Sequence, residues 1–532
     1  MSLPLPKSKQ RSSSQGALHL LLRIAPCENE PKNTRKSNKG QHFVKPEASL
    51  SQRVTRAGAW VFTLRIIEKG FGFIRLIILA RLLAPNDFGL MGIALLTLSI
   101  IETFSETGFQ TALIQKKKDI SAYLDTAWTV SILRGIALCI IIFFSAPYVG
   151  LFFKSTEASS IIQVLGLSIL LRGFTNTGII YFQKELEFNK QFIYGLITTS
   201  ADFIVAILAA VILKNIWALV FGYLAANLAG LVASYLIQPY RPRLSLDFKR
   251  IKELSGFGKW VFGYNILYFF LMQGDDFFVG KVLGIAALGF YQMAYKISNI
   301  PATEITHVIS KVIFPAYSKM QDDLPRLRES YVRVLQFIAF FSFPIAGLIF
   351  ILAPEFTMIF LGNKWMPMVP AMQVLVLWGL VRSLGTTTGT LLVSVGKPAI
   401  VTKLHFATLI LLGSLIYPLS VTWGILGTSL AVLFAMVVPN LVAFIVIIKV
   451  IRLKIYNLTK MIFLPLLNTG FLILLISLAK PYWVNFGILG FSLFVIIGLT
   501  SYCCIAYLFD KFYDYRLVDN IKMNIYSLKN LQ

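Results

Sequence analysis

Apolar residues fall along this chain in runs of about twenty, separated by short polar stretches. Fourteen runs are present, at roughly 56–80, 88–112, 123–150, 158–182, 191–213, 216–238, 256–280, 286–313, 332–353, 367–394, 399–420, 424–449, 459–479 and 483–509. A helix of about twenty apolar residues is long enough to cross the hydrocarbon core of a bilayer. The pattern therefore predicts an all-α integral membrane protein with about fourteen transmembrane helices. No stretch between the runs is long enough to hold a soluble catalytic domain.

The composition agrees with this interpretation and limits the possible chemistry. Hydrophobic residues make up 56% of the 532 positions and charged residues 14%, whereas soluble proteins are roughly 25% charged. The four cysteines lack the spacing of a metal site, and the four histidines are dispersed. We therefore expect no bound metal, no disulfide framework and no cofactor.

The formal net charge of +25 comes from basic residues that are concentrated in alternate loops. The basic loops lie near residues 116–118, 184–190, 241–252, 319–333, 397–403 and 449–460. The opposite loops hold about one cation each, namely Arg81, Lys154, Lys214, Lys281, Lys364 and Lys480. By the positive-inside rule, this asymmetry places both termini in the cytoplasm. The basic excess reflects membrane topology, so nucleic acid is not an expected partner.

Two pairs of similar segments indicate an internal duplication. QVLGLSILLR at 163–172 returns as QVLVLWGLVR at 373–382, with six identities in ten and an arginine at the end of each. RLLAPNDFGLMGIA at 81–94 returns as KVLGIAALGFYQMA at 281–294. We predict two six-helix repeats, related by an axis along the membrane normal, that form two lobes around a central cavity. Two further helices follow at the C-terminus.

The expected organisation of the chain follows from these repeats. It comprises a polar extension at 1–50, an N-lobe at 51–240, a cytoplasmic linker at 241–255, a C-lobe at 256–455, two added helices at 456–510 and a cytoplasmic tail at 511–532. The extension is rich in serine, lysine and asparagine, which is typical of disorder. We interpret it either as a disordered segment or as the result of a misassigned start codon.

Five stretches, in order along the chain, resemble the polysaccharide transporter family, the Wzx-type flippases of the multidrug/oligosaccharidyl-lipid/polysaccharide exporter superfamily. They are ARLLAPNDFGLMGIA at 80–94, ETGFQTALIQKK at 106–117, ALGFYQMAYKISNIP at 287–301, KVIFPAYSKMQDD at 311–323 and LLVSVGKP at 391–398. The resemblance implies a multi-pass protein of the bacterial inner membrane. It further implies that this protein moves an oligosaccharide linked to undecaprenyl diphosphate, an isoprenoid diphosphate, from the cytoplasmic to the periplasmic leaflet. Such transport serves lipopolysaccharide, capsule or exopolysaccharide assembly, with glycosyltransferases and a polysaccharide polymerase as partners alongside the membrane lipids.

The first predicted helix carries an unusual number of charges. Arg65, Glu68 and Arg75 follow helical spacing along one face, and Lys69 lies beside them. Charges within a span are costly and rarely face lipid. These cations therefore either line a hydrated cavity or form ion pairs with Glu68 within the helix while the end residues snorkel to the interface.

Four other cations in predicted spans are candidates for contact with a diphosphate or a glycan. They are Arg134, Arg172, Lys296 and Arg382. A guanidinium group presents a planar fork of donors that suits phosphate oxygens. The alternative is a structural ion pair with a neighbouring carboxylate, and for Arg134 this partner would be Glu102 or Glu106.

Acidic residues in the spans allow two roles that the sequence leaves open. They are Glu102, Glu106, Asp202, Asp275, Asp276 and Glu304. One of them, or Glu68, is a protonation or sodium site if transport is coupled to an ion gradient; otherwise they balance the arginines. Lys296, Glu304 and His307 fall on consecutive turns of one predicted helix and are expected to form a polar seam.

Two other classes of protein compete with the flippase interpretation. A cation-coupled multidrug exporter of the same superfamily would share the repeat, but cationic drugs require acidic cavities and this chain places several arginines in its spans. A membrane enzyme, such as a polymerase or glycosyltransferase, would be expected to have a large outer loop or a catalytic carboxylate motif. All the outer loops here are short. We therefore expect a transporter and not an enzyme.

Overall fold

The computed structural model describes residues 67–106, 108–116, 120–185, 187–300, 306–483 and 487–513. Within these ranges all regular secondary structure is helical. The N-terminal extension, Arg65 and the predicted tail after residue 513 lie outside the described residues.

The first half of the described chain, residues 67–240, contains a helix at 67–82 and eight labelled elements. These are α3 (Pro85–Phe104), α4 (Phe109–Gln115), α5 (Ser121–Phe152), α6 (Thr156–Gly173), η1 (Thr177–Ile179), α7 (Ile180–Lys184), α8 (Phe188–Leu213) and α9 (Trp217–Ile237). The chain bends by 70° between α6 and the η1–α7 segment, so the predicted span at 158–182 is not one straight helix.

The second half, residues 248–513, contains the remaining elements. These are α10 (Phe248–Val282), α11 (Ile285–Ser298), α12 (His307–Lys319), α13 (Leu324–Phe356), the π-helical turn η3 (Thr357–Leu361), η4 (Asn363–Met368), α14 (Val369–Ser394), α15 (Pro398–Val450), α16 (Ile455–Trp483) and α17 (Gly487–Tyr513). The long α15 is broken at Gly424, whose φ of 58° is readily adopted only by glycine. This break coincides with the boundary between the predicted spans at 399–420 and 424–449.

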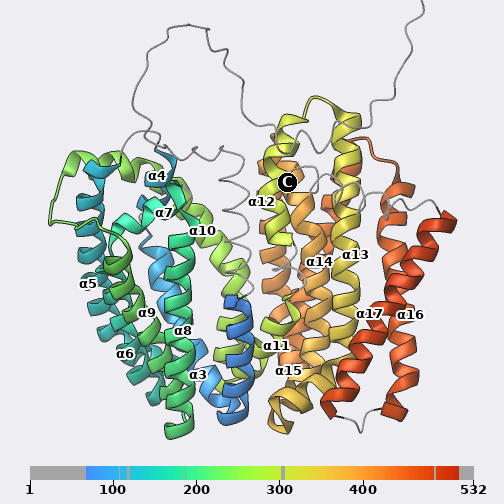
Figure 1. The fold of residues 1–532 in the computed structure, drawn as a ribbon, viewed down its shortest axis with the longest axis horizontal. Helices are drawn as coiled ribbons and strands as arrows, with labels where there is room; N and C mark the ends of the chain where they lie inside the picture. Colours follow the sequence, from blue (N-terminus) through green and yellow to red (C-terminus); the bar gives the residue numbers. More distant parts are fainter. Residues whose placement is uncertain are drawn as a thin grey trace, which may run out of the picture.

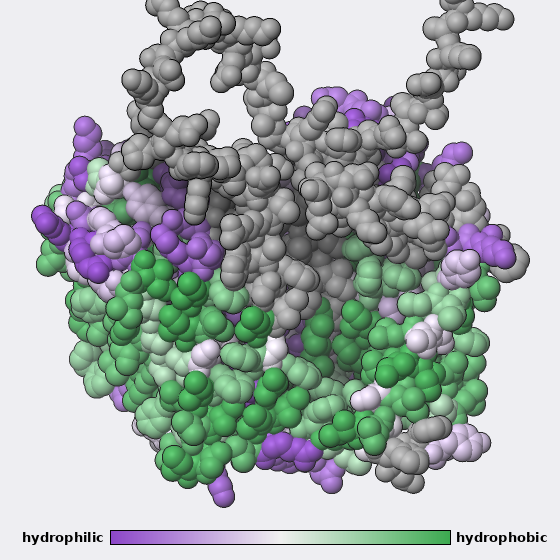
Figure 2. All heavy atoms as spheres, in the orientation of Figure 1, coloured by the Kyte–Doolittle hydropathy of each residue, from purple (hydrophilic) through white to green (hydrophobic). Residues whose placement is uncertain are grey.

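Nine of the described helices are long and apolar enough to cross a membrane, or ten if the bent pair at α6 and α7 is one span. The protein is therefore a multi-pass membrane protein. The helices α10 and α11 are not among the nine, and both carry charged residues, including Asp275, Asp276 and Lys296. Figure 2 shows an apolar band around the middle of the visible face, with polar side chains gathered at its two ends.

The two halves of the chain form two groups of helices that lie side by side (Figure 1). Helices α5, α6, α8 and α9 lie on one side and α12 to α17 on the other, with α3, α10 and α11 between them. One buried core continues across the boundary, from Leu90 and Ile162 in the first half to Tyr291 and Trp365 in the second. The two halves are therefore packed against each other where these residues lie.

Helices α3 and α11 cross at two glycines. A Cβ atom on Gly89 would lie 1.9 Å from the carbonyl oxygen of Ile285, and a Cβ atom on Gly289 would lie 2.0 Å from that of Pro85. Only glycine permits backbones to approach this closely. The two contacts are equivalent in the repeat. Gly89 and Ile285 of the first contact correspond to Gly289 and Pro85 of the second, each 200 positions away along the chain.

Candidate functional site

Charged side chains from three helices meet at the boundary between the two halves. The Nη2 atom of Arg75, in the helix at 67–82, lies 2.8 Å from the Oδ1 atom of Asp202 in α8. Lys296, in α11 of the other half, is close enough to interact electrostatically with Arg75, Lys69 and Asp202. Within the described part of the chain, this boundary cluster therefore brings Lys69, Arg75 and Lys296 near Asp202.

The boundary cluster retains capacity to bind an anion. The side chains of Lys69 and Lys296 are exposed, and that of Arg75 is 21% exposed. The buried Nε atom of Arg75 has no hydrogen-bond acceptor among the described residues. An uncompensated cationic donor of this kind is costly to bury and is suited to an incoming anion.

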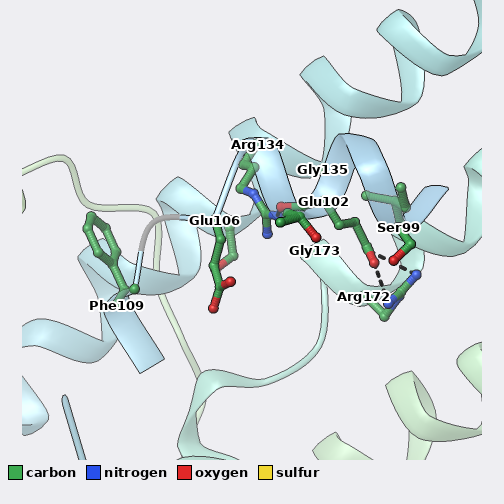
Figure 3. A pocket seen from close by; sticks show the side chains of 12 residues that line it. Ser99, Glu102, Glu106, Phe109, Arg134, Gly135, Arg172 and Gly173 are labelled. Carbon is green, nitrogen blue, oxygen red and sulfur yellow. Dashed lines mark hydrogen bonds and ion pairs between the residues drawn. The ribbon is translucent and has the colours of Figure 1, made fainter. Parts of the chain in front are cut away.

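A cavity of about 460 Å³ opens in the first half, between α3, α5 and α6 (Figure 3). Its lining includes two carboxylates and two guanidinium groups, from Glu102, Glu106, Arg134 and Arg172. Small residues, one aromatic ring and one aliphatic side chain complete the wall. They are Ser99, Thr103, Gly108, Ser131, Gly135 and Gly173, with Phe109 and Ile169. The ionisable groups are balanced in number, and the size is typical of a small-ligand pocket.

The two arginines of this cavity are held by different contacts. Arg172 forms an ion pair with Glu102 at 3.0 Å and donates to the hydroxyl of Tyr223 at 3.3 Å. Arg134 donates to the hydroxyl of Ser105 at 2.9 Å and to the carbonyl of Glu102 at 3.1 Å. In Figure 3 the Arg172 and Glu102 side chains point toward each other at one side of the cavity. The predicted ion pair is thus formed by Arg172, whereas Arg134 is held by a hydroxyl and a carbonyl.

The cavity is linked to the other half of the chain at the end of α3. The amide of Asn265, in α10, donates to Glu106 Oε2 at 2.6 Å. A movement of α10 relative to α3 therefore changes the wall of the cavity. Asn265 was not apparent from the sequence, because an uncharged amide in an apolar run gives no signal without its partner.

Arg382 lies in a different environment, on α14. Its guanidinium donates to Asn299 Oδ1 at 3.3 Å and to the Tyr295 hydroxyl at 3.4 Å, and it lies 5.2 Å from the centre of the Trp378 ring. Among the described residues it forms no ion pair within 4 Å, although its charge interacts with that of Asp275. The sequence repeat predicts equivalent arginines, but the structure pairs Arg172 with a carboxylate and surrounds Arg382 with neutral polar and aromatic groups.

The acidic pair of α10 is bonded to α11. The Tyr291 hydroxyl donates to Asp275 Oδ2 at 2.6 Å, and the Gln292 amide donates to Asp276 Oδ2 at 3.1 Å. The Oδ1 atom of Asp276 is buried and has no hydrogen-bond partner in the described chain. Neutral donors of α11 therefore bind both carboxylates of α10.

Several predicted site residues are not placed by these contacts. Arg65 and Glu304 lie outside the described residues, as does the side chain of His307. Helix α11 ends at Ser298 and α12 begins at His307, and residues 301–305 between them lie outside the described residues. In the described ranges, no group of three or more histidine, cysteine, aspartate or glutamate side chains is arranged to hold a metal ion.

Comparisons with known proteins place these features in a family context. Residues 78–370 match the family model described as polysaccharide biosynthesis protein. The lipopolysaccharide biosynthesis protein WzxC of Escherichia coli (strain K12) is 25% identical over 444 residues, which cover 82% of this chain and 86% of WzxC.

Two solved structures are similar in fold. The lipid II flippase MurJ, in an inward closed conformation, superposes with a TM-score of 0.65 over 86% of this chain and 99% of that one, at 16% identity. An inward-facing transporter of the multidrug resistance MATE family superposes with a TM-score of 0.56 over 76% of this chain and 98% of that one, at 14% identity. The fold is thus shared by transporters with very different cargoes, and it does not distinguish between them.

Proposed function

Because the chain belongs to the family of polysaccharide biosynthesis proteins, we propose that it is a transporter that flips a lipid-linked oligosaccharide across the bacterial inner membrane. The cargo is an oligosaccharide on undecaprenyl diphosphate, destined for lipopolysaccharide, capsule or exopolysaccharide. The protein moves this cargo without making or breaking a covalent bond, and so it is not an enzyme.

The cargo poses a physical problem that defines the site. Its diphosphate and glycan are strongly hydrated, and an unpaired charge in hydrocarbon costs far more than thermal energy supplies. Its polyprenyl tail is apolar and remains in the lipid. The transporter must therefore offer cations and hydroxyl partners to the head group between two lobes, while leaving the tail outside.

The observation that carries this proposal is the boundary cluster of Lys69, Arg75 and Lys296 around Asp202. Three cations facing one carboxylate favour an anion, and they come from both halves of the chain. We assign the diphosphate to this cluster, with the Nε atom of Arg75 as one donor. Arg65, ten residues before Arg75 in the same predicted span, is expected to extend the site.

We assign the first sugars to the cavity lined by Arg134 and Arg172. Glu102 and Glu106 accept hydrogen bonds from hydroxyl groups, and the two arginines donate to ring and hydroxyl oxygens. Arg382 supplies a further donor from the second half. Asp275 and Asp276 balance its charge or bind the coupling ion, a proton or sodium, and Glu68, Glu304 and His307 are the other candidates for this role.

We propose that the helices form fourteen spans in two six-helix lobes and a C-terminal pair, with the domain boundaries predicted above. Both termini face the cytoplasm. The lobes alternate between an inward-open and an outward-open arrangement around the boundary cluster. The reciprocal glycine contacts of α3 and α11, shifted by 200 positions, support this two-fold layout.

A deletion strain tests the proposal. Loss of the gene is expected to abolish the surface polysaccharide and to leave a complete lipid-linked oligosaccharide in the cytoplasmic leaflet. The control is a strain in which a glycosyltransferase encoded by a neighbouring gene is catalytically inactive. That strain also lacks the surface polysaccharide but accumulates no complete intermediate. Normal export from the deletion strain would refute the flippase assignment. Unchanged polysaccharide together with increased sensitivity to cationic drugs would instead support the alternative, a cation-coupled multidrug exporter.

A further inference from the structure

At one end of the boundary, an arginine of the first half binds the carbonyl groups of the second. Arg81 lies in the last turn of the helix at 67–82, and its Nε atom donates to the carbonyl of Phe360 at 2.9 Å. Its Nη2 atom donates to the carbonyl of Ile359 and, at 3.4 Å, to that of Met358. These carbonyls belong to the π-helical turn η3, which ends at Leu361. A cation at the C-terminal end of a helix satisfies its unpaired carbonyls and is favoured by the helix dipole.

A lysine of the second half makes the reverse contact. Lys281 lies in the last turn of α10, and its Nζ atom donates to the carbonyl of Phe152 at 2.7 Å. The same ammonium group lies 4.0 Å from the centre of the Phe152 ring. Phe152 is the last residue of α5, so Lys281 binds a helix C-terminus in the opposite half, as Arg81 does.

The two contacts occupy matching positions in the duplicated segments. Arg81 begins the segment 81–94 and Lys281 begins the segment 281–294. Each cation precedes one of the two helices, α3 and α11, that cross at Gly89 and Gly289. The two contacts are therefore equivalent in the repeat, and in each a cation of one half binds a helix C-terminus of the other half.

An indole group strengthens the contact on the Arg81 side. The fully buried Trp365 donates from Nε1 to the carbonyl of Ala80 at 2.9 Å. Its ring packs edge-on against Phe88 of the first half and Phe290 of the second. Lys364 also donates to the carbonyl of Arg81 at 2.9 Å. Together these contacts close this end of the boundary.

We propose that Arg81 and Lys281 are a crossed pair of latches that hold this end of the transporter closed, and that both must release before the cargo leaves there. The inference rests on the proposed alternating-access function. Each latch ends on backbone carbonyls, so release leaves no buried carboxylate behind.

Thiol labelling of the closed end tests this proposal without any substrate. Leu288, in α11, is fully buried and lies with Phe153 beside Gly280, next to the Lys281 contact, so a cysteine at this position in an otherwise cysteine-free protein reports opening to a water-soluble maleimide. Arg81→Ala and Lys281→Ala are each expected to raise the labelling rate about tenfold, as for the loss of a charge-assisted hydrogen bond. The double variant is expected to label faster than either single variant, and Arg81→Lys to label at an intermediate rate.

A matched control uses a cation that is near the latch but not part of it. Lys154 is exposed, lies two residues after Phe152, and forms no side-chain hydrogen bond within the described part of the chain. Lys154→Gln is expected to label at the wild-type rate and to retain the wild-type unfolding temperature.

Wild-type labelling rates in both single variants and the double variant would overturn the latch proposal, as would an equal rate increase in the control. A variant that unfolds is replaced by its conservative form, Arg81→Lys or Lys281→Arg, whose rates decide the question. Because labelling requires no cargo, its failure leaves the flippase assignment intact, whereas normal polysaccharide export from the deletion strain refutes that assignment alone.

Discussion

Replacing the two members of the Arg75–Asp202 ion pair is expected to shift diphosphate binding in opposite directions. Arg75 forms an ion pair with Asp202 at 2.8 Å, and its Nε donor has no hydrogen-bond partner within the described part of the chain. In the proposed complex, the diphosphate takes this donor and competes with Asp202 for the rest of the guanidinium group. Arg75→Ala therefore removes a donor, whereas Asp202→Asn removes the competing negative charge.

The magnitude follows from the kind of contact. A hydrogen bond to a charged group contributes about 1.5–3 kcal/mol, which corresponds to roughly 10- to 150-fold in a dissociation constant. The Arg75 side chain is 21% exposed, so solvent screens part of its charge and we expect about tenfold weaker binding for Arg75→Ala. For Asp202→Asn we expect binding about tenfold tighter than that of the wild-type protein.

The assay is the affinity of the detergent-solubilised protein for undecaprenyl diphosphate, measured by the quenching of tryptophan fluorescence, with undecaprenyl monophosphate as the reference ligand. Arg243→Ala is the matched control, because Arg243 is an exposed arginine in the linker between the two halves. If Arg75 and Asp202 form only a structural pair, both variants will lose stability together and neither will discriminate between the two lipids. Equal affinity of wild type and both variants would refute the role of the boundary cluster.

Three further predictions concern other parts of the structure. Glu102→Gln should keep undecaprenyl diphosphate binding within about twofold of wild type but reduce polysaccharide export about tenfold, because it breaks the ion pair to Arg172 in the sugar cavity; unchanged export would remove this cavity from the path. Arg382→Ala should lower export with normal protein levels in a membrane immunoblot, and Arg382→Lys should restore only part of it, since the guanidinium stacks near an aromatic ring and lysine lacks the planar fork; full restoration by lysine would reduce its role to charge alone. Gly289→Ala should lower the unfolding temperature in a thermal scan and cost about 1–3 kcal/mol, because its Cβ would lie 2.0 Å from the Pro85 carbonyl; an unchanged temperature would show that α3 and α11 are not tightly packed there.

Much of the fold was predictable from hydrophobic patterning. Nine helices of the described chain are long and apolar enough to cross a membrane, and the break at Gly424 separates two predicted spans. The bend between α6 and α7 and the end of α11 at Ser298 were not predictable, since apolar runs continue through both positions. Hydropathy measures the preference of a segment for lipid, and it contains little information about where a helix axis turns.

The site was predictable by residue type but not by pairing. Charges within apolar runs drew attention to Arg75, Asp202 and Arg172, because such charges are expensive in a bilayer, and the structure places all three in ion pairs. Their partners depend on which helices are neighbours, and this is a property of the tertiary structure. Arg81 and Lys281 were interpreted only as cations of the outer loops, although their matching positions in the repeat carried the signal that relates them.

The most direct test of the central claim is leaflet exchange in proteoliposomes that contain a short oligosaccharide on undecaprenyl diphosphate, detected by a membrane-impermeant enzyme or lectin. The account predicts that the wild-type protein exchanges the lipid between leaflets and that replacing Lys69, Arg75 and Lys296 together by alanine abolishes exchange while the protein remains folded. Exchange at the wild-type rate by this triple variant would contradict the account.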